Sequence, residues 1–211
     1  MKNLFPSLTA LWLCLAVSSS MAQTSKGTFL LGGSLGFSSG HSTSTYDYLS
    51  TPSKQKQSTI SLAPNVSYFV IDRLSIGIVT PLSYTQYKRE DIDQKTTYRS
   101  YSIGPLIRYY FPLGSHWAIF PEASYSYGWM ETMGHYSING DVFRQTFRGN
   151  ARNLQGGLGL TYFLNPNIGL EGKFRYQSMR DTYNHAGLDH VDNNSFDFTI
   201  GVQVYLFRNT Q

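Results

Sequence analysis

A histidine and a serine stand two positions apart in His135-Tyr-Ser137, and side chains of these two types could do chemistry together. A serine hydroxyl with an imidazole as its base is the minimum set for acyl transfer. Asp141 is the nearest acid that could orient the histidine, but its spacing is not the one expected of such a site. The pair lies in a polar stretch that we expect to be a loop, so we interpret it as non-catalytic.

A second group of candidate residues lies in the stretch from 181 to 193. His185, Asp189 and His190 offer imidazole and carboxylate groups, which bind zinc or calcium, and Asp181 and Asp192 are near them in the sequence. Their spacing matches no defined metal motif. We therefore expect a solvated loop with no metal, and the chain shows no phosphate-binding loop, thiol motif or zinc constellation that would predict a cofactor.

A third pattern is a row of charges at alternate positions between 167 and 178. Glu171, Lys173 and Arg175 stand at every second position, and large apolar residues such as Leu170 and Phe174 stand between them. Side chains alternate faces along a strand, so the charges share one face and the apolar groups share the other. A protein in water should bury the apolar face, whereas a protein in lipid should bury the charges.

The rest of the chain repeats this alternation and shows no sustained helical periodicity. We predict an all-β fold from eight such segments: 27–38, 58–70, 74–85, 100–111, 117–129, 153–164, 167–178 and 195–207. Each runs roughly ten to fourteen residues, which is enough to cross a bilayer when tilted.

The connections between these segments alternate in length. Three are short, and four are long and polar, at about 39–57, 88–97, 131–149 and 180–194. An even number of antiparallel strands, with short turns at one end and long loops at the other, is typical of an up-and-down transmembrane β-barrel. We therefore predict short periplasmic turns and long extracellular loops.

The composition of the two strand faces decides which one points inward. One face carries Gly, Ser, Thr, Ala, Asn and Gln, which fit a narrow lumen, and the other is apolar and aromatic and would contact lipid. We expect the aromatics to point to lipid and to form two girdles. The residues of the two girdles are Tyr68, Tyr109, Phe111, Trp117 and Tyr162 at the short-turn end, and Tyr84, Trp129, Tyr176, Phe196 and Phe198 at the long-loop end.

Six charged residues then face the lumen, three basic and three acidic: Arg108, Glu122, Glu171, Lys173, Arg175 and Asp197. Unpaired charges in a confined lumen would be costly, so we expect a paired network that plugs the barrel, with Arg108 and Glu122 offset diagonally on adjacent strands. The alternative is a wet channel with solvated charges.

The first 22 residues read as a signal peptide rather than as part of the fold. Lys2 is followed by the apolar run 8–17, which is too short for a membrane helix, and small residues at Ser20 and Ala22 precede the expected cleavage. The mature domain would then be 23–211, with no cysteine, because Cys14 lies in the apolar run. The net charge is +4, but the basic residues are scattered, so we expect no nucleic-acid partner.

The last strand carries the most specific local pattern, in which Thr199, Gly201, Val204 and Leu206 match the spacing of a C-terminal assembly signal. With the eight-strand pattern, this segment resembles the small outer-membrane barrels of the OmpA transmembrane and OmpX type, and more closely the outer membrane protein beta-barrel domain family. One departure is that four residues follow Phe207, where many members end on the aromatic.

The resemblance implies a bacterial outer-membrane location and contact with outer-membrane lipid and lipopolysaccharide. It also implies insertion by the barrel-assembly machinery and a non-enzymatic role in the membrane or through an unknown extracellular partner of the loops. We expect a monomer. Two alternatives stay open: a small diffusion pore, and a lipid A-modifying acyl hydrolase, since outer-membrane lipid A deacylases carry a His-x-Ser pair like that of His135 and Ser137.

Overall fold

The computed structural model describes residues 22–44, 53–89, 94–138, 141–185 and 188–206. A short 3-10 helix, Ala22–Thr24, precedes ten strands: β1 Phe29–Ser44, β2 Ser53–Ile71, β3 Leu74–Val79, β4 Leu82–Arg89, β5 Gln94–Tyr109, β6 Phe111–Leu113, β7 Trp117–Ile138, β8 Asp141–Asn165, β9 Ile168–His185 and β10 Leu188–Leu206. Within these ranges, no helix is long and apolar enough to span a membrane.

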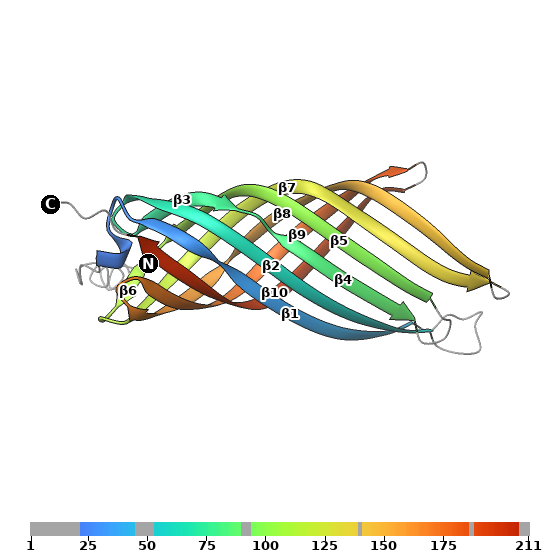
Figure 1. The fold of residues 1–211 in the computed structure, drawn as a ribbon, viewed down its shortest axis with the longest axis horizontal. Helices are drawn as coiled ribbons and strands as arrows, with labels where there is room; N and C mark the ends of the chain where they lie inside the picture. The colour runs from blue at the N-terminus through green and yellow to red at the C-terminus, as the bar shows by residue number, and fades with distance from the viewer. Residues whose placement is uncertain (1–21, 45–52, 90–93, 139–140, 186–187, 207–211) are drawn as a thin grey trace, which may run out of the picture.

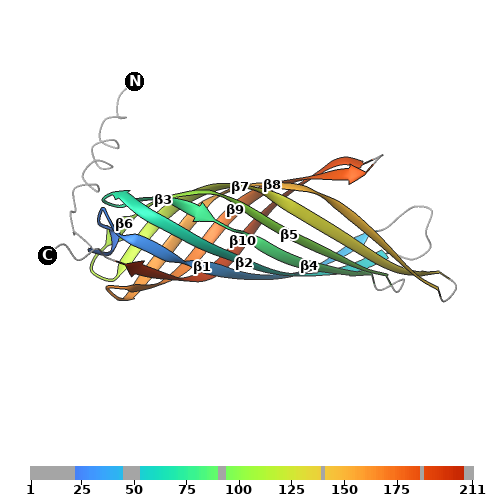
Figure 2. The ribbon, with the colours of Figure 1, turned by 45° about the horizontal axis from the view of Figure 1, so that its top comes forward.

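The strands close into one antiparallel ring (Figures 1 and 2). β1 pairs with β2 on one side and with β10 on the other, and the ring continues through β9, β8, β7 and β5 to β3 and β4, both of which pair with β2. β3 with β4, and β5 with β6, each share one strand position, so ten strands fill eight positions (10 − 2 = 8). The fold is therefore the predicted eight-stranded up-and-down barrel.

A proline accounts for the division between β3 and β4. Pro81 has no N–H to donate to the ladder, and the strand is interrupted at Thr80 and Pro81. The neighbouring strands still hold this point, because Thr80 N donates to Pro64 O at 2.9 Å and Ser102 N donates to Pro81 O at 3.0 Å. The interruption leaves the ring closed.

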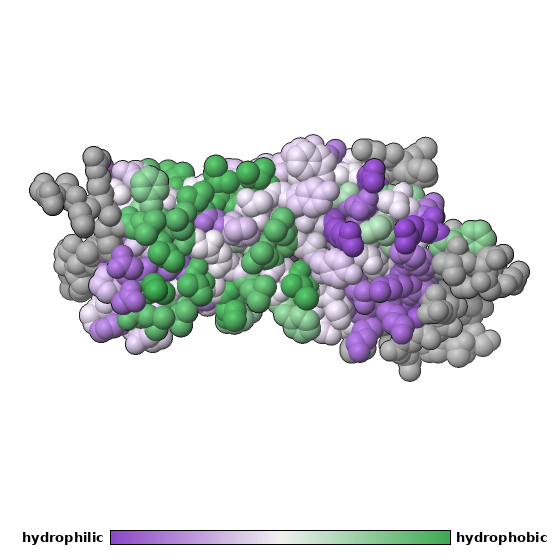
Figure 3. Space-filling view, in the orientation of Figure 1, coloured by the Kyte–Doolittle hydropathy of each residue, from purple (hydrophilic) through white to green (hydrophobic). Residues whose placement is uncertain are grey.

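The two ends of the barrel differ. At the turn end, short turns join β2 to β3, β6 to β7 and β8 to β9; at the hairpin end, the strands extend into long hairpins (Figure 1). On the face seen in Figure 3, apolar side chains are concentrated from the turn end to the middle of the barrel, and hydrophilic ones gather at the hairpin end. Leu170, Phe174 and Tyr176 are exposed, whereas Glu171, Lys173 and Arg175 are 3–5% exposed, so the charged face points inward.

The expected lengths of strands and loops are wrong at the hairpin end. All eight ring positions are longer than the predicted segments, and β7 and β8 alone have 22 and 25 residues. Residues 131–149, expected to be a loop, lie in β7 and β8 apart from 139–140. The polar residues there keep alternating, and pairing across the hairpin satisfies their backbone N–H and C=O groups without an apolar face.

The expectation that aromatics point to lipid is also wrong for one group. The girdle residues do lie on the outer surface, but five other aromatic side chains are buried in the lumen at the turn end: Phe69, Tyr110, Phe120, Phe163 and Tyr205. Four of them occupy inward positions of their strands and Tyr110 lies between β5 and β6, and small residues such as Ala118 and Gly169 leave the space that the rings fill. The lumen is thus polar over most of its length and aromatic at one end.

Candidate functional site: the lumen of the barrel

Four of the predicted lumenal charges form one buried network near the middle of the barrel. Arg108 on β5 lies directly opposite Glu122 on β7, not diagonally as expected, and its Nε donates to Glu122 Oε2 at 3.0 Å. Arg108 Nη1 also reaches Glu171 Oε2 at 3.4 Å, and Lys173 Nζ lies 3.4 Å from Glu122 Oε1. Two cations and two anions from three strands therefore balance in charge inside the lumen.

Neutral side chains complete the coordination of Glu171. Thr161 Oγ1 donates to its Oε1 at 3.3 Å, and Gln203 Nε2 donates to its Oε2 at 3.1 Å. Each carboxylate oxygen thus has a cationic and a neutral donor, which is what makes a buried charge tolerable.

The other two predicted charges form a separate pair toward the hairpin end. Arg175 donates from Nε to Asp197 Oδ1 at 3.1 Å and from Nη2 to Oδ2 at 2.6 Å, a two-bond geometry that fixes both side chains. Arg175 Nη1 also donates to Gln155 Oε1 at 3.2 Å. All six predicted residues lie in the lumen, in two charge-balanced groups.

The wall facing the network is packed against it. Ser75, Thr161, Thr199 and Gln203 are almost completely buried. Several polar atoms at this level have no partner within the described part of the chain, including both side-chain polar atoms of Asn65. These atoms are also inaccessible to solvent, so the side chains are closely packed inside the lumen at this level.

Below this layer, the five inward aromatics and Leu30 form a cluster with Ala118 at the turn end. The ring of Tyr110 lies 4.9 Å from that of Phe120 and 5.5 Å from that of Phe69, measured between centroids. The Arg108 guanidinium lies 5.2 Å from the centre of the Phe120 ring, so the cluster touches the charge network. Ions in the network and rings beneath it form one continuous packed region.

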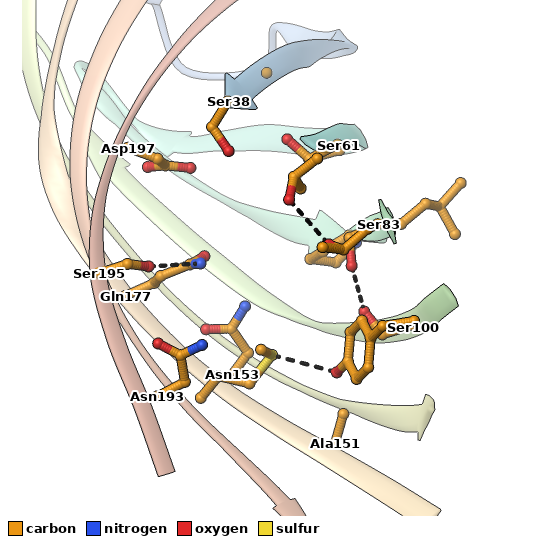
Figure 4. A pocket seen from close by; sticks show the side chains of 18 of the residues that line it. Ser38, Ser61, Ser83, Ser100, Ala151, Asn153, Gln177, Asn193, Ser195 and Asp197 are labelled. Atoms are coloured by element: carbon orange, nitrogen blue, oxygen red, sulfur yellow. Dashed lines mark hydrogen bonds between the residues drawn. The ribbon is translucent and has the colours of Figure 1, made fainter. Parts of the chain in front are cut away.

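Above the network, the hairpin-end half of the lumen holds a cavity of about 630 Å³. Serine side chains point into it from one wall, and amides and serine from the other (Figure 4). The labelled residues of the two walls are Ser38, Ser61, Ser83 and Ser100, and opposite them Asn153, Gln177, Asn193, Ser195 and Asp197. Ser83 and Ser100 share a hydrogen bond of 2.7 Å, and Gln177 Nε2 donates to Ser195 Oγ at 3.0 Å.

One hydrogen bond crosses this cavity from β5 to β9. The hydroxyl of Tyr98 donates to the Asp181 carboxylate, at 2.9 Å from Oδ2 and 3.1 Å from Oδ1. Asp181 is 6% exposed, and burial raises the pKa of its carboxyl to about 6. It lies five residues beyond Tyr176 of the girdle, in the part of β9 that extends past the apolar band.

The candidate acyl-transfer pair does not lie in the expected loop. His135 and Ser137 are both in β7, and Asp141 is the first residue of β8, where it pairs with Ile138. His135 Nε2 accepts a hydrogen bond from Arg144 Nε at 3.0 Å. The side chains of Ser137 and Asp141 lie outside the described residues, so the structure assembles no triad that can be described.

The candidate metal ligands also lie in strands rather than in a loop. His185 ends β9, and Asp189 and His190 are in β10. The side chains of His185 and Asp189 lie outside the described residues, and His190 Nε2 lies 3.9 Å from Asp192 Oδ2. Where side chains are described, no three His, Cys, Asp or Glu residues are grouped as metal ligands.

The proposed assembly signal lies in β10, which closes the ring against β1. Thr199 points into the lumen, and Leu206 is exposed on the outer surface. Residues 207–211, and residues 1–21 of the expected signal peptide, lie outside the described residues.

A closed antiparallel ring with an apolar exterior and charges buried inside is the arrangement of a membrane-spanning barrel. A family model, the outer membrane protein beta-barrel domain, matches residues 7–203 of this chain. The chain belongs to that family, and its place is therefore the bacterial outer membrane. Since barrels of this kind have short periplasmic turns, we expect the turn end to be periplasmic and the hairpin end extracellular.

The solved structures to which this chain is similar are distant in sequence. Neisserial surface protein A is 20% identical, with 85% of this chain and 97% of that chain covered and a TM-score of 0.37. OprG from Pseudomonas aeruginosa is 16% identical, with coverages of 90% and 100% and a TM-score of 0.48. Ail of Yersinia pestis is 14% identical, with coverages of 86% and 99% and a TM-score of 0.39. No curated protein sequence gives a significant match.

Two features of the lumen were missed by the sequence analysis. The aromatic cluster was detectable from the sequence, because Tyr110 and Tyr205 stand two residues after inward-facing Arg108 and Gln203, and Phe120 stands two residues before inward-facing Glu122. Strict alternation places them inside. The bond between Tyr98 and Asp181 joins residues 83 positions apart, on strands that are not neighbours, and no local pattern predicts it.

Proposed function

We propose that this protein is a non-enzymatic outer-membrane barrel whose lumen is closed to solutes. The observation that carries this proposal is the charge-balanced network of Arg108, Glu122, Glu171 and Lys173, whose members are 1–8% exposed. A solute passing this level would have to separate buried ion pairs, which costs several kcal/mol for each uncompensated charge. The aromatic cluster beneath the network offers a second barrier, because its residues are 0–1% exposed.

A closed lumen directs the function to the membrane or to the extracellular hairpins. We propose that the barrel supports the outer membrane through contact with its lipid and lipopolysaccharide, or presents its hairpins to an extracellular partner. Export through a cleaved signal peptide of residues 1–22, insertion by the barrel-assembly machinery through the β10 signal, and a monomeric state belong to the same proposal. Neither a metal nor another cofactor has a part in it.

The second candidate function is a small diffusion pore. It is favoured by the cavity of about 630 Å³, which already occupies the extracellular half of the lumen. Only the network and the aromatic cluster then separate this cavity from the periplasm. The two candidates differ in whether those layers open.

A liposome-swelling assay separates the two functions. The protein is refolded into vesicles, its folded state is verified by the change in gel mobility on heating, and the vesicles are diluted into an isotonic solution of arabinose. We expect no swelling beyond that of protein-free vesicles, while a general porin in parallel vesicles gives rapid swelling. Swelling at a rate that rises with the amount of this protein would reject the closed lumen and support the pore.

A further inference from the structure

Asp181 is a buried carboxylate without a cation beside it. Its hydrogen bonds come from the Tyr98 hydroxyl alone, and no Arg, Lys or His side chain within the described ranges lies at ion-pair distance from it. Glu122 and Glu171, the two other carboxylates that are buried among the residues the structure describes, each contact a cation. A buried carboxylate needs a positive charge beside it or must be protonated. Asp181 therefore lacks the neighbouring cation that Glu122 and Glu171 have.

Aromatic and thioether groups surround this carboxylate. Tyr98 packs with Met130 and Ala151, and Tyr87, Met179 and Tyr183 pack against that cluster. Tyr98 also brings its hydroxyl within 3.7 Å of the Met179 sulfur. Tyr87 of β4, Tyr98 of β5, and Met179 and Tyr183 of β9 line the same cavity as Asp181. Tyrosine rings grouped around a negative charge are the chemistry by which proteins bind ammonium groups, through the attraction between a cation and the π face.

The remainder of the cavity does not supply the missing charge. Its charged lining residues are Arg175, Asp181 and Asp197, and the first and last of these neutralise one another. Asp181 therefore gives the described lining a net charge of −1 while it is ionised. The other lining groups near it, including Ser100 and Asn153, are neutral hydrogen-bonding groups that suit the polar part of a small molecule.

We propose that this cavity binds a small organic cation, an ammonium compound of the size of choline or ethanolamine. Asp181 is its counter-charge, Tyr87, Tyr98 and Tyr183 contact the ammonium group, and the serine and amide walls receive its hydroxyl. A cavity of about 630 Å³ is within the range of ordinary ligand sites and exceeds the volume of such a molecule. The site lies above the charge network, so the proposal does not depend on whether the lumen is closed.

The ionisation of Asp181 gives the proposal a second readout. The titratable groups that face it are Tyr98 from β5, Tyr183 from β9 and Tyr87 from β4, while β8 presents Ala151 and β7 presents Met130 and Thr132. The tyrosines stay neutral near pH 7, since burial raises the pKa of Tyr98 and its neighbours. Burial also raises the pKa of Asp181 to about 6, so the carboxylate is charged at neutral pH and loses its charge in mild acid.

The test is isothermal titration of the refolded barrel in a maltoside detergent and phosphate buffer, both free of ammonium groups. The probes are choline, ethanolamine and 3,3-dimethyl-1-butanol, in which an uncharged carbon replaces the nitrogen of choline. We expect saturable binding of at least one cation at about pH 8, weaker by about tenfold or more for the isostere, and lost at about pH 5. Asp181→Asn should bind the cation about tenfold more weakly than the wild type or worse. Asp192→Asn is the control, because it changes the net charge equally at an exposed ion pair, and it should bind the cation as the wild type does.

Each other outcome overturns the proposal. Equal binding of choline and its isostere would mean that the cavity does not select for positive charge. If the wild-type protein is shown to be folded and binds neither cation, Asp181 has a structural role only. Unchanged binding by Asp181→Asn would place the cation elsewhere. If Asp181→Asn fails to fold, Tyr183→Leu replaces it and should weaken choline binding several-fold, and unchanged binding there counts against the tyrosine contacts.

Discussion

Replacing Glu122 with alanine removes one of the two anions from the buried network. Glu122 contacts Arg108 at 3.0 Å and Lys173 at 3.4 Å, so a single substitution takes a partner from two cations at once. Arg108, Lys173 and Glu171 remain, and the network changes from neutral to a net charge of +1. The barrel must then hold an uncompensated cation in a place from which the packed walls exclude water.

The size of the effect follows from what each cation retains. Breaking a buried ion pair by removing one partner costs about 3–5 kcal/mol. Arg108 keeps Glu171 at 3.4 Å and its position over the Phe120 ring, which lowers the penalty. We therefore expect Glu122→Ala to lower the free energy of unfolding by about 2–4 kcal/mol. Replacing Arg108 and Glu122 together by leucine keeps one cation and one anion, so the double variant should lose less than the single one.

The assay is urea unfolding of the barrel in lipid vesicles, followed by tryptophan fluorescence. Glu131→Ala is the matched control, because Glu131 lies on the same strand and pairs with Arg148 at 2.9 Å, but Arg148 is 78% exposed. An exposed pair contributes about 0–1 kcal/mol, so this variant should unfold close to the wild type. A urea midpoint unchanged by Glu122→Ala would refute the reasoning, as would equal losses for the two variants.

Three further predictions concern other parts of the lumen. A Cβ at Gly159 would meet the Phe120 ring, so Gly159→Ala should lower the free energy of unfolding by about 1–3 kcal/mol. Gly156→Ala is the control: nothing lies within 4 Å of a Cβ there, so it should change stability by less than about 0.5 kcal/mol. Similar urea midpoints for the two variants would contradict the packed aromatic cluster. Because burial raises the pKa of Asp181 from 3.8 to about 6, the folded barrel holds a proton that the unfolded chain releases. The stability that this proton contributes should be fully present below about pH 4 and lost as the pH rises through about 6. If the stability of Asp181→Asn falls as steeply with pH over that window as the stability of the wild type, another group must titrate there. Cells that express the wild type or His135→Ala should carry lipid A of identical, unmodified mass, and a mass change that requires His135 would revive the acyl hydrolase.

The sequence alone was enough to predict the barrel, because its evidence is spread over the whole chain. Alternation in eight segments and the short joins at Asp72, Ser115 and Pro166 define the order of the ring without any long-range information. The six lumenal charges follow from the same alternation, since a charge on the small-residue face of a strand in lipid must point inward.

The length of the hairpins was not predictable from the same signal. Beyond the girdle both faces of each strand are solvated, so both carry polar residues. The alternation of apolar and polar residues that marks strands inside the membrane is therefore lost, and the sequence there is the same as that of a polar loop. The contacts between side chains across the lumen could not be predicted from local sequence patterns either. Tyr98 and Asp181 lie on strands that do not pair, and their contact depends on the width and tilt of the closed ring rather than on either segment.

The closed lumen is the central claim, and ion conductance of the refolded protein in a planar bilayer tests it most directly. Insertion is verified independently by protease protection of the membrane-embedded part. The ion network and the aromatic cluster predict a silent membrane at voltages where a general porin conducts steadily. Reproducible channels of uniform size would contradict the account, because they would require the pairs formed by Arg108, Glu122, Glu171 and Lys173 to separate in the folded barrel.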